Sequence, residues 1–324
     1  MAKMGVIGTG AWGTALAQMM ASNGHDVIMV GPDETAISDI NDNNRNEAYL
    51  PDQPLSASIT ASNDWEALRG SEAVLYVAPT QIIPDLIPHF DAHVDPNVPL
   101  IFCCKGLIRK TRQLPTQYMD DHAPSHETAV LSGPSFAHDV AAGLPTAVTL
   151  GADTVEKAVY LAHWIGTESF RLYASDDKLG VQFGGALKNV LAIACGMAIG
   201  RGLGESAKAA LIARGFAELR RFACHYGAKD ETLMGLSGLG DLVLTASTSQ
   251  SRNFALGEAL GQGAPLPSKL AEGAFTASVV VEKVEAEGIE MPIATAVHHV
   301  LTEAITIEEA INGLLSRSLK VEEE

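Results

Sequence analysis

The sequence has few positive charges and few cysteines. Its 22 lysines and arginines face 39 aspartates and glutamates, which gives a net charge of −17 at pH 7. Such a field disfavours nucleic acid and anionic membranes as partners, because both are themselves anionic. The four cysteines form no Cys-x-x-Cys pair, and neither they nor the ten histidines show a metal-ligand pattern. We therefore expect a reduced, cytoplasmic protein without a metal site.

Long apolar runs are also missing. The longest covers residues 190–199, well short of the roughly 20 residues that a membrane helix needs, so we expect no integral membrane segment. The chain passes from Met1 almost directly into a strand-like run, and we expect no signal peptide. With 324 residues and 47% hydrophobic content, it is long enough for about two domains with cores of their own.

The two halves of the chain have different patterns. Strand-like runs separated by helix or loop patterns occupy the first half, at residues 3–7, 26–30, 73–78, 100–104, 129–131, 147–150 and 169–173. Helical patterns follow at residues 186–199, 206–226, 254–260, 277–287, 293–303 and 307–314. This predicts an α/β protein: a Rossmann-like doubly wound sheet in a dinucleotide-binding domain, residues 1–179, followed by an all-helical substrate and catalytic domain, residues 180–324.

A glycine motif joins the first predicted strand to the first predicted helix. Gly8, Gly10 and Gly13 form Gly-x-Gly-x-x-Gly, and a second strand follows within about 30 residues. In this context Gly8 permits a tight turn, Gly10 lets the backbone approach a pyrophosphate, and Gly13 lets helix and strand pack closely. The helix N-terminus would then bind the phosphates. The alternative is a glycine-rich turn without a ligand.

Asp33 lies about 20 residues beyond Gly13, where an acidic residue usually binds the ribose hydroxyls of NAD. Residues 31–34 contain no arginine that could bind the extra phosphate of NADP. This favours NAD, although an acidic residue in an exposed loop is common.

Two lysines stand out. Lys188 lies in a small, apolar, helix-like run, where an ammonium without a partner costs several kcal/mol or has its pKa lowered. It is a candidate acid/base catalyst or anion ligand, unless it reaches the surface or forms a structural ion pair. Lys105 follows a predicted strand and precedes Gly106, where a lysine could bind a phosphate or carbonyl group or simply be solvated.

A second anion site is indicated near residue 251. Ser251 and Asn253 can cap a helix, and Arg252 would lie in its first turn. An arginine there opposes the helix dipole unless an anion binds or a nearby acidic residue pairs with it.

Together these segments resemble the bacterial type of NAD(P)-dependent glycerol-3-phosphate dehydrogenase over nearly the whole chain. The segments that carry the resemblance, in the order of the family, are Gly8 to Ala17, Lys105-Gly106, Gly133-Pro134-Ser135-Phe136-Ala137, Gly185 to Val190, Gly238-Leu239-Gly240-Asp241 and Ser251-Arg252-Asn253.

The resemblance implies reversible hydride transfer between NAD(P)H and dihydroxyacetone phosphate, giving sn-glycerol 3-phosphate for phospholipid synthesis. It implies that Lys188 is the general acid/base and that Asp241 orients it. The implied substrate-binding residues are Lys105, Gly133, Ser135, Lys188, Asp241, Ser251, Arg252 and Asn253. The implied cofactor-binding residues are Gly8, Gly10, Ala11, Trp12, Gly13, Asp33, Lys105, Ala137, Arg252, Leu270 and Glu272.

The chain departs from the family pattern at two positions that bear on function. Pro32 replaces an arginine that many members carry, which puts NADPH preference in doubt. Gln182 replaces an acidic residue, which predicts one charge fewer on the approach to Lys188. Three alternatives stay open: a related β-hydroxyacid or ketopantoate-type reductase, a non-catalytic dinucleotide-binding sensor, and an interaction protein with a vestigial site. The alanine- and glycine-rich helices of the second half could bury a homodimer interface.

Overall fold

The structure is a computed structural model that describes residues 2–266 and 271–317. These residues form two compact units. The first contains residues up to 185 together with 227–241, and the second contains residues 186–226 and the described part of 242–324. The predicted domains, 1–179 and 180–324, remain a proposal about which part carries the dinucleotide chemistry.

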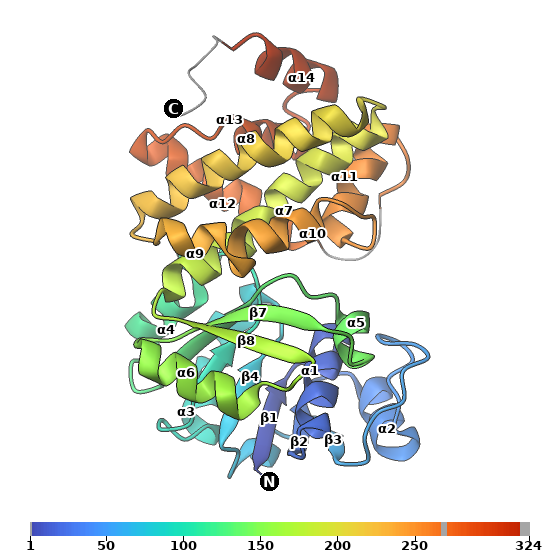
Figure 1. The fold of residues 1–324 in the computed structure, drawn as a ribbon, viewed down its shortest axis with the longest axis vertical. Helices are drawn as coiled ribbons and strands as arrows, with labels where there is room; N and C mark the ends of the chain where they lie inside the picture. Colours follow the sequence, from blue (N-terminus) through green and yellow to red (C-terminus); the bar gives the residue numbers. More distant parts are fainter. Residues whose placement is uncertain (1, 267–270, 318–324) are drawn as a thin grey trace. The chain divides into compact units, whose positions relative to one another are not determined.

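The first unit alternates strands and helices (Figure 1). Its strands are β1 (Lys3–Ile7), β2 (Asp26–Val30), β3 (Ile59–Ser62), β4 (Ala73–Tyr76), β5 (Leu100–Phe102), β6 (Thr128–Ser132), β7 (Thr146–Gly151) and β8 (Phe170–Ser175). Its helices are α1 (Ala11–Ser22), α2 (Glu34–Asn43), α3 (Ile83–His93), α4 (Pro115–His122), α5 (Ala137–Ala141), α6 (Val155–Ile165) and α9 (Asp230–Met234). Two 3₁₀ turns (Trp65–Leu68 and Thr80–Ile82) complete it, together with a π-helical turn, Leu236–Gly240.

The eight strands form one sheet in the order β3-β2-β1-β4-β5-β6-β7-β8. All neighbouring pairs are parallel except β6 and β7, which are antiparallel. Strands β2 and β3 lie on one side of β1, and β4 to β8 lie on the other. The strand order therefore switches between β1 and β4, and doubly wound folds bind ligands in the crevice at such a point. The doubly wound sheet predicted from the sequence is confirmed.

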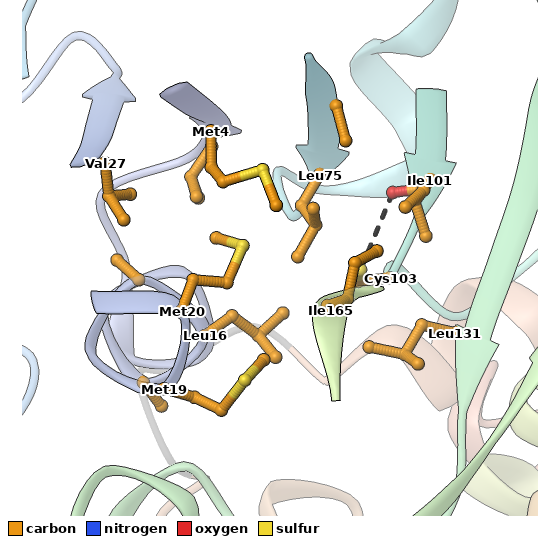
Figure 2. Packing of buried hydrophobic residues seen from close by; sticks show 14 of the residues in the cluster. Met4, Leu16, Met19, Met20, Val27, Leu75, Ile101, Cys103, Leu131 and Ile165 are labelled. Carbon is orange, nitrogen blue, oxygen red and sulfur yellow. Dashed lines mark hydrogen bonds between the residues drawn. The ribbon is translucent and has the colours of Figure 1, made fainter. Parts of the chain in front are cut away.

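Each face of the sheet is covered by its own helices, because successive strand residues point to opposite faces. Leu75 and Ile101 belong to a core that includes α1 and α6, whereas Tyr76 and Phe102 belong to a core that includes α3 and α4. Figure 2 shows the first core, in which Leu16 and Met20 of α1 lie against Met4 and Leu75, with Ile165 of α6 nearby. Strands buried on both faces read as continuous apolar runs, which is why most of them are visible in the sequence.

Strand β3 was missed by the sequence analysis. It has four residues, Ile59–Ser62, lies at the sheet edge, and within the described residues pairs with β2 alone. Its two buried residues alternate with an exposed threonine and a partly exposed serine, so no apolar run marks it.

The second unit is helical. It contains α8 (Gly204–His225), α11 (Arg252–Gln262), α12 (Glu272–Glu287), α13 (Pro292–Leu301) and α14 (Ile307–Leu315). Helix α7 (Lys178–Gly200) begins in the first unit and ends in the second, and α10 (Asp241–Thr245) likewise starts at the last residue of the first unit. Among the described residues α7 is long and apolar enough to cross a membrane, but 89% of its most apolar window is buried, as in a core helix. The predicted all-helical second half is confirmed.

Two helices of the second unit touch at backbone distance. A Cβ atom added at Gly196 of α7 would lie 2.1 Å from the carbonyl oxygen of Phe254, and one added at Gly257 of α11 would lie 2.0 Å from that of Ile193. Gly200 and Gly261, each four residues further on, make the same kind of contact. We call these four glycines the α7–α11 seam. It fixes the start of α11 against the helix that carries Lys188.

Candidate functional site

Glycine occupies each of the three motif positions for a different structural reason. Gly8 has a φ of +122°, in the region that favours glycine. A Cβ atom at Gly13 would lie 2.1 Å from the carbonyl oxygen of Gly8, so only glycine allows this approach of helix and turn. Nothing in the described part of the chain lies within 4 Å of a Cβ atom added at Gly10. The turn therefore leaves open space at the N-terminus of α1, as a bound pyrophosphate requires.

Among residues 2–266 and 271–317 no side chain caps the N-terminus of α1, whose N-cap residue is Gly10 and whose first turn contains no acidic residue. The helix dipole there is consequently available to an anion. Ala11 and Trp12 begin this helix, and Trp12 packs against the same core as Ala137, the first residue of α5. Helices α1 and α5 contact each other, so these three predicted cofactor-contacting residues lie on neighbouring elements.

Asp33 is the N-cap of α2. Its Oδ1 accepts hydrogen bonds from the N–H groups of Thr35 and Ala36, and its Oδ2 accepts one of 2.8 Å from the hydroxyl of Tyr49. The Ala36 N–H and then the Tyr49 hydroxyl are the main causes that lower the pKa of Asp33 below its usual value. The carboxylate is therefore ionised and oriented, and the sequence analysis did not foresee Tyr49.

Lys105 lies beyond the carboxyl end of β5, next to the loop that follows β6. These strands are parallel neighbours, so their carboxyl ends lie at the same edge of the sheet. The Lys105 Nζ donates to the carbonyl oxygen of Gly133, 3.3 Å away, and the Ser135 hydroxyl donates to the same oxygen, 3.2 Å away. A Cβ atom at Gly133 would lie 2.7 Å from the Cα of Val148, so this loop packs tightly against β7. Three predicted substrate-binding residues are thus adjacent.

Asp241 is the strongest partner of Lys105. Its Oδ2 accepts a hydrogen bond of 2.5 Å from Lys105 Nζ, and its side chain is only 1% exposed. Asp241 follows the π-helical turn Leu236–Gly240, a rare geometry that often marks functional sites. A Cβ atom at Gly238 would lie 2.0 Å from the Leu233 carbonyl oxygen, which explains a glycine in this motif.

Two glycines of α7 allow the π-helical turn and the segments around Ser132 and Lys105 to pack closely against this helix. A Cβ atom at Gly184 would lie 2.5 Å from the Ser237 carbonyl oxygen of the π-helical turn. A Cβ atom at Gly185 would lie 2.5 Å from the Ser132 hydroxyl and 3.3 Å from the Lys105 side chain. Lys188 follows Gly184 by about one helical turn on the same helix.

Lys188 is buried, at 6% exposure. Its Nζ donates a hydrogen bond of 2.6 Å to Oγ1 of Thr245, which is itself buried. Thr245 was missed by the sequence analysis. The only available signal was its position four residues after Asp241 in α10, which places both side chains on one helix face.

The second predicted anion site is built where α11 begins. Ser251 is the N-cap and its hydroxyl accepts from the Phe254 N–H, as predicted. Asn253 does not cap the helix. Its Oδ1 accepts instead from the N–H of Gly273, 2.9 Å away, and so joins the starts of α11 and α12. Arg252, in the first turn of α11, is exposed.

Glu272 lies next to Gly273, at the first position of α12. Burial raises the pKa of Glu272, and the charge of Arg252 partly offsets this effect. Within the described residues, Oε2 of Glu272 is buried and has no hydrogen-bond partner. A buried acceptor of this kind is suited to a donor on a ligand. Leu270, the remaining predicted cofactor-binding residue, lies outside the described residues.

Gln182 makes its hydrogen bonds within the first unit. Its amide accepts from the Thr116 N–H and donates to the Thr116 hydroxyl and to the carbonyl oxygen of Lys178. On a helix, residues six positions apart point about 120° away from each other, so Gln182 and Lys188 lie on different sides of α7. Gln182 therefore ties α7 to the start of α4.

Comparison with known proteins identifies the family. The model of the NAD-dependent glycerol-3-phosphate dehydrogenase N-terminus matches residues 3–158, and that of the C-terminus of the same enzyme matches residues 177–312. The chain belongs to the NAD-dependent glycerol-3-phosphate dehydrogenase family.

Individual relatives are similar to this chain over nearly its whole length. Glycerol-3-phosphate dehydrogenase [NAD(P)+] of a Bradyrhizobium species is 49% identical over 319 residues, covering 98% of both chains. The enzyme of the same name from Brucella ovis is 47% identical and covers 99% of both. Among solved structures, the glycerol-3-phosphate dehydrogenase of Coxiella burnetii superposes with a TM-score of 0.92 at 35% identity, covering 98% of this chain and 99% of its own. The family inferred from the motifs is confirmed, and a ketopantoate-type reductase is set aside.

Proposed function

We propose that the chain catalyses reversible hydride transfer between NAD(P)H and dihydroxyacetone phosphate, giving sn-glycerol 3-phosphate for glycerophospholipid synthesis in the cytoplasm. The observation that carries the chemistry is the buried Lys188, held by Thr245 in a chain whose family performs this reaction. When bound, the nicotinamide supplies or accepts the hydride.

Lys188 acts as the general acid/base. Reducing a ketone places negative charge on its oxygen, and a proton must reach that oxygen as the charge develops. The Lys188 ammonium donates this proton during reduction and recovers it during oxidation. The hydrogen bond to Thr245 Oγ1 fixes the direction of the ammonium, so less freedom is lost when the substrate binds.

Lys105 and Asp241 form a charged pair that acts on the same substrate. The Lys105 ammonium, partly exposed at 19%, binds the substrate oxygens, while the buried Asp241 carboxylate holds it in place. Gly133 and Ser135 line the substrate beside it. That Asp241 also orients Lys188 stays a prediction.

Arg252 binds the substrate phosphate and approaches the cofactor. A guanidinium at the capped start of α11 offers a fork of donors, and the helix N-terminus adds its free N–H groups. Ser251 and Asn253 support this element by fixing the starts of α11 and α12. The same bonds leave each of their side chains capacity for a ligand.

The cofactor binds at Gly8, Gly10 and Gly13, with Asp33 on the adenine ribose and Glu272 at the other end. Further proposed contacts are Ala11, Trp12, Lys105, Ala137, Arg252 and Leu270. Because an ionised Asp33 repels a 2′-phosphate and no arginine accompanies it in residues 31–34, we propose that NADH is used at least as well as NADPH.

We also propose that the chain forms a homodimer. Leu203 and Leu315 of the second unit are 44% and 79% exposed, and both line an apolar cavity of about 590 Å³ between α7, α8, α13 and α14. Exposed apolar surface of this kind often marks an interface with another protein chain.

The decisive test follows NADH and NADPH oxidation with dihydroxyacetone phosphate. We expect turnover that requires the phosphate on the substrate. No turnover would favour a non-catalytic dinucleotide-binding sensor.

Lys188→Met tests the proton donor, and we expect kcat to fall by about 10³-fold. Lys208→Met is the matched control, because Lys208 is also largely buried in the second unit but pairs with Glu205 on α8. Near-normal turnover of Lys188→Met with an unchanged pH profile would contradict the assignment.

A further inference from the structure

The buried side-chain amide of Asn46 forms hydrogen bonds with the glycine turn. Asn46 follows α2 and is 1% exposed. Its Nδ2 donates hydrogen bonds of 2.9 Å to the carbonyl oxygen of Thr9 and of 2.8 Å to Oγ1 of Thr14. Thr9 lies inside the glycine turn and Thr14 in the first turns of α1. One side chain therefore bridges the two segments that meet at the dinucleotide site.

The orientation of this amide is fixed by chemistry. A carbonyl oxygen can only accept, so the NH₂ group of Asn46 must face Thr9. Both of its protons are used, while Oδ1 is buried without a hydrogen-bond partner in the described part of the chain. An aspartate would present a second acceptor to the Thr9 carbonyl and repel it. Neither an apolar residue nor aspartate can thus replace this contact.

The bond to Thr9 sets the direction of one peptide group. The Thr9 carbonyl and the Gly10 N–H belong to the same trans peptide and point in opposite directions. With the carbonyl held towards Asn46, the Gly10 N–H must point to the other side. Among the described residues, a Cβ atom added at Gly10 would meet nothing within 4 Å, so there is open space beside this residue at the N-terminus of α1.

The bond to Thr14 fixes a second peptide group of the turn. The Thr14 hydroxyl donates to the Gly10 carbonyl oxygen, 3.0 Å away, which also accepts the first helical hydrogen bond from the Thr14 N–H. Both carbonyl groups beside Gly10 are therefore fixed, one directly by Asn46 and one through Thr14. A backbone that is already oriented binds a ligand at a lower cost in conformational entropy.

We infer that Asn46 is a positioning residue for the cofactor, which orients the Thr9–Gly10 peptide so that its N–H points towards the pyrophosphate. The inference rests on the proposed function only in taking the ligand to be a nicotinamide dinucleotide. NADH and NADPH share the pyrophosphate, so Asn46 affects both equally and leaves the choice between them unchanged.

The test measures the Kd of NADH and of NADPH directly, by fluorescence titration without substrate. For Asn46→Ala we expect both Kd values to rise by about tenfold, with the NADH/NADPH ratio unchanged. Saturating cofactor should restore kcat, and the KM for dihydroxyacetone phosphate should stay the same. If Asn46→Ala does not fold, Thr14→Val keeps the shape and should raise both Kd values about threefold.

Asn41→Ala is the control, because Asn41 also ties α2 to its surroundings with two hydrogen bonds, both to Ala61. It should lower stability without changing either Kd. If Asn46→Ala or Thr14→Val lowers Tm but leaves both Kd values unchanged, Asn46 is only structural and the inference is wrong. A wild-type chain that binds NADH but does not turn over dihydroxyacetone phosphate would overturn the proposed function and leave this test intact.

Discussion

The Tyr49 hydroxyl donates a hydrogen bond of 2.8 Å to the Asp33 carboxylate, the group expected to bind the adenine ribose. The other carboxylate oxygen is held by the N–H groups of Thr35 and Ala36. Asp33 thus has one oxygen fixed by backbone and one oriented by a side chain that is 43% exposed and within reach of a ligand.

Tyr49→Phe should weaken NADH binding selectively. Without the hydroxyl, Oδ2 of Asp33 loses its orienting donor and the pKa of Asp33 moves back towards its usual value. We expect the KM for NADH to rise about threefold and that for NADPH to change less, because the Asp33 charge that repels the 2′-phosphate remains. Steady-state kinetics with each cofactor measures this. The control is Tyr160→Phe, on the exposed face of α6, and equal changes for both cofactors would contradict the prediction.

Gly13→Ala should reduce stability, whereas Gly10→Ala should weaken cofactor binding without reducing stability. The alanine at 13 would meet the Gly8 carbonyl oxygen, so we expect it to lower the free energy of unfolding by about 2 kcal/mol or more. The alanine at 10 meets nothing, and its φ of −76° suits any residue, so Tm should stay the same. It would nevertheless occupy space next to the pyrophosphate and raise the KM for NADH at least tenfold. Thermal unfolding and kinetics of both variants distinguish the two effects.

Asp241→Asn should disable the Lys105 site. The substitution removes the charge that holds the ammonium, and we expect kcat to fall by about 10²-fold together with a lower Tm. Lys105→Met should cause a loss of similar size. If the two residues act as one pair, the double variant should be little worse than either single variant. Additive losses in this double-mutant cycle would show that they act separately.

Glu218 should make stability depend on pH. It is 4% exposed on α8, and its carboxylate accepts hydrogen bonds from the N–H groups of Ile293 and Ala294, where α13 begins. Burial raises the pKa of Glu218 to about 7, although these N–H groups act in the opposite direction. Between pH 4.5 and 7 the folded protein therefore binds more protons than the unfolded chain. The free energy of unfolding should fall as pH rises through this window, by about 3 kcal/mol from this group.

Urea unfolding of the wild type and Glu218→Gln at pH 5 and pH 8 isolates the contribution. The glutamine stays neutral at both pH values and keeps an acceptor for the N–H groups. The stability advantage of the wild type over the variant should therefore be smaller at pH 8 than at pH 5. An equal difference at both pH values would contradict the raised pKa.

Features that depend on residues close together in the sequence could be predicted from it. The turn at Gly8 and the close packing at Gly13 follow from short spacings, and the Ser251 cap follows from one helix start. The approach of Gly10 to a pyrophosphate stays a prediction. Contacts between distant segments could not be read in this way. Asn253 bonds to Gly273, twenty residues away, and no local pattern distinguishes that use from capping.

The same reason explains the missed residues around the cofactor site. Asn46 and Tyr49 reach the glycine turn and Asp33 because the chain after α2 folds back towards β1, which depends on the sheet order. Gln182 bonds to Thr116 and Lys178, which no local pattern indicates, and the expected loss of one charge near Lys188 stays a prediction. The direction of a side chain on a long helix depends on which faces other elements cover.

The α7–α11 seam limits how the substrate range of this chain can change. Glycine is already the smallest residue, so any substitution at Gly196, Gly200, Gly257 or Gly261 can only move the two helices apart. The helix that carries Lys188 and the helix that begins at Arg252 therefore pack at backbone contact distance along the seam. In the proposed site these helices carry the proton donor and the phosphate ligand, so we expect seam substitutions to lengthen the span between the two and not to shorten it. We therefore expect single substitutions in the seam to favour substrates with a longer carbon chain over shorter ones.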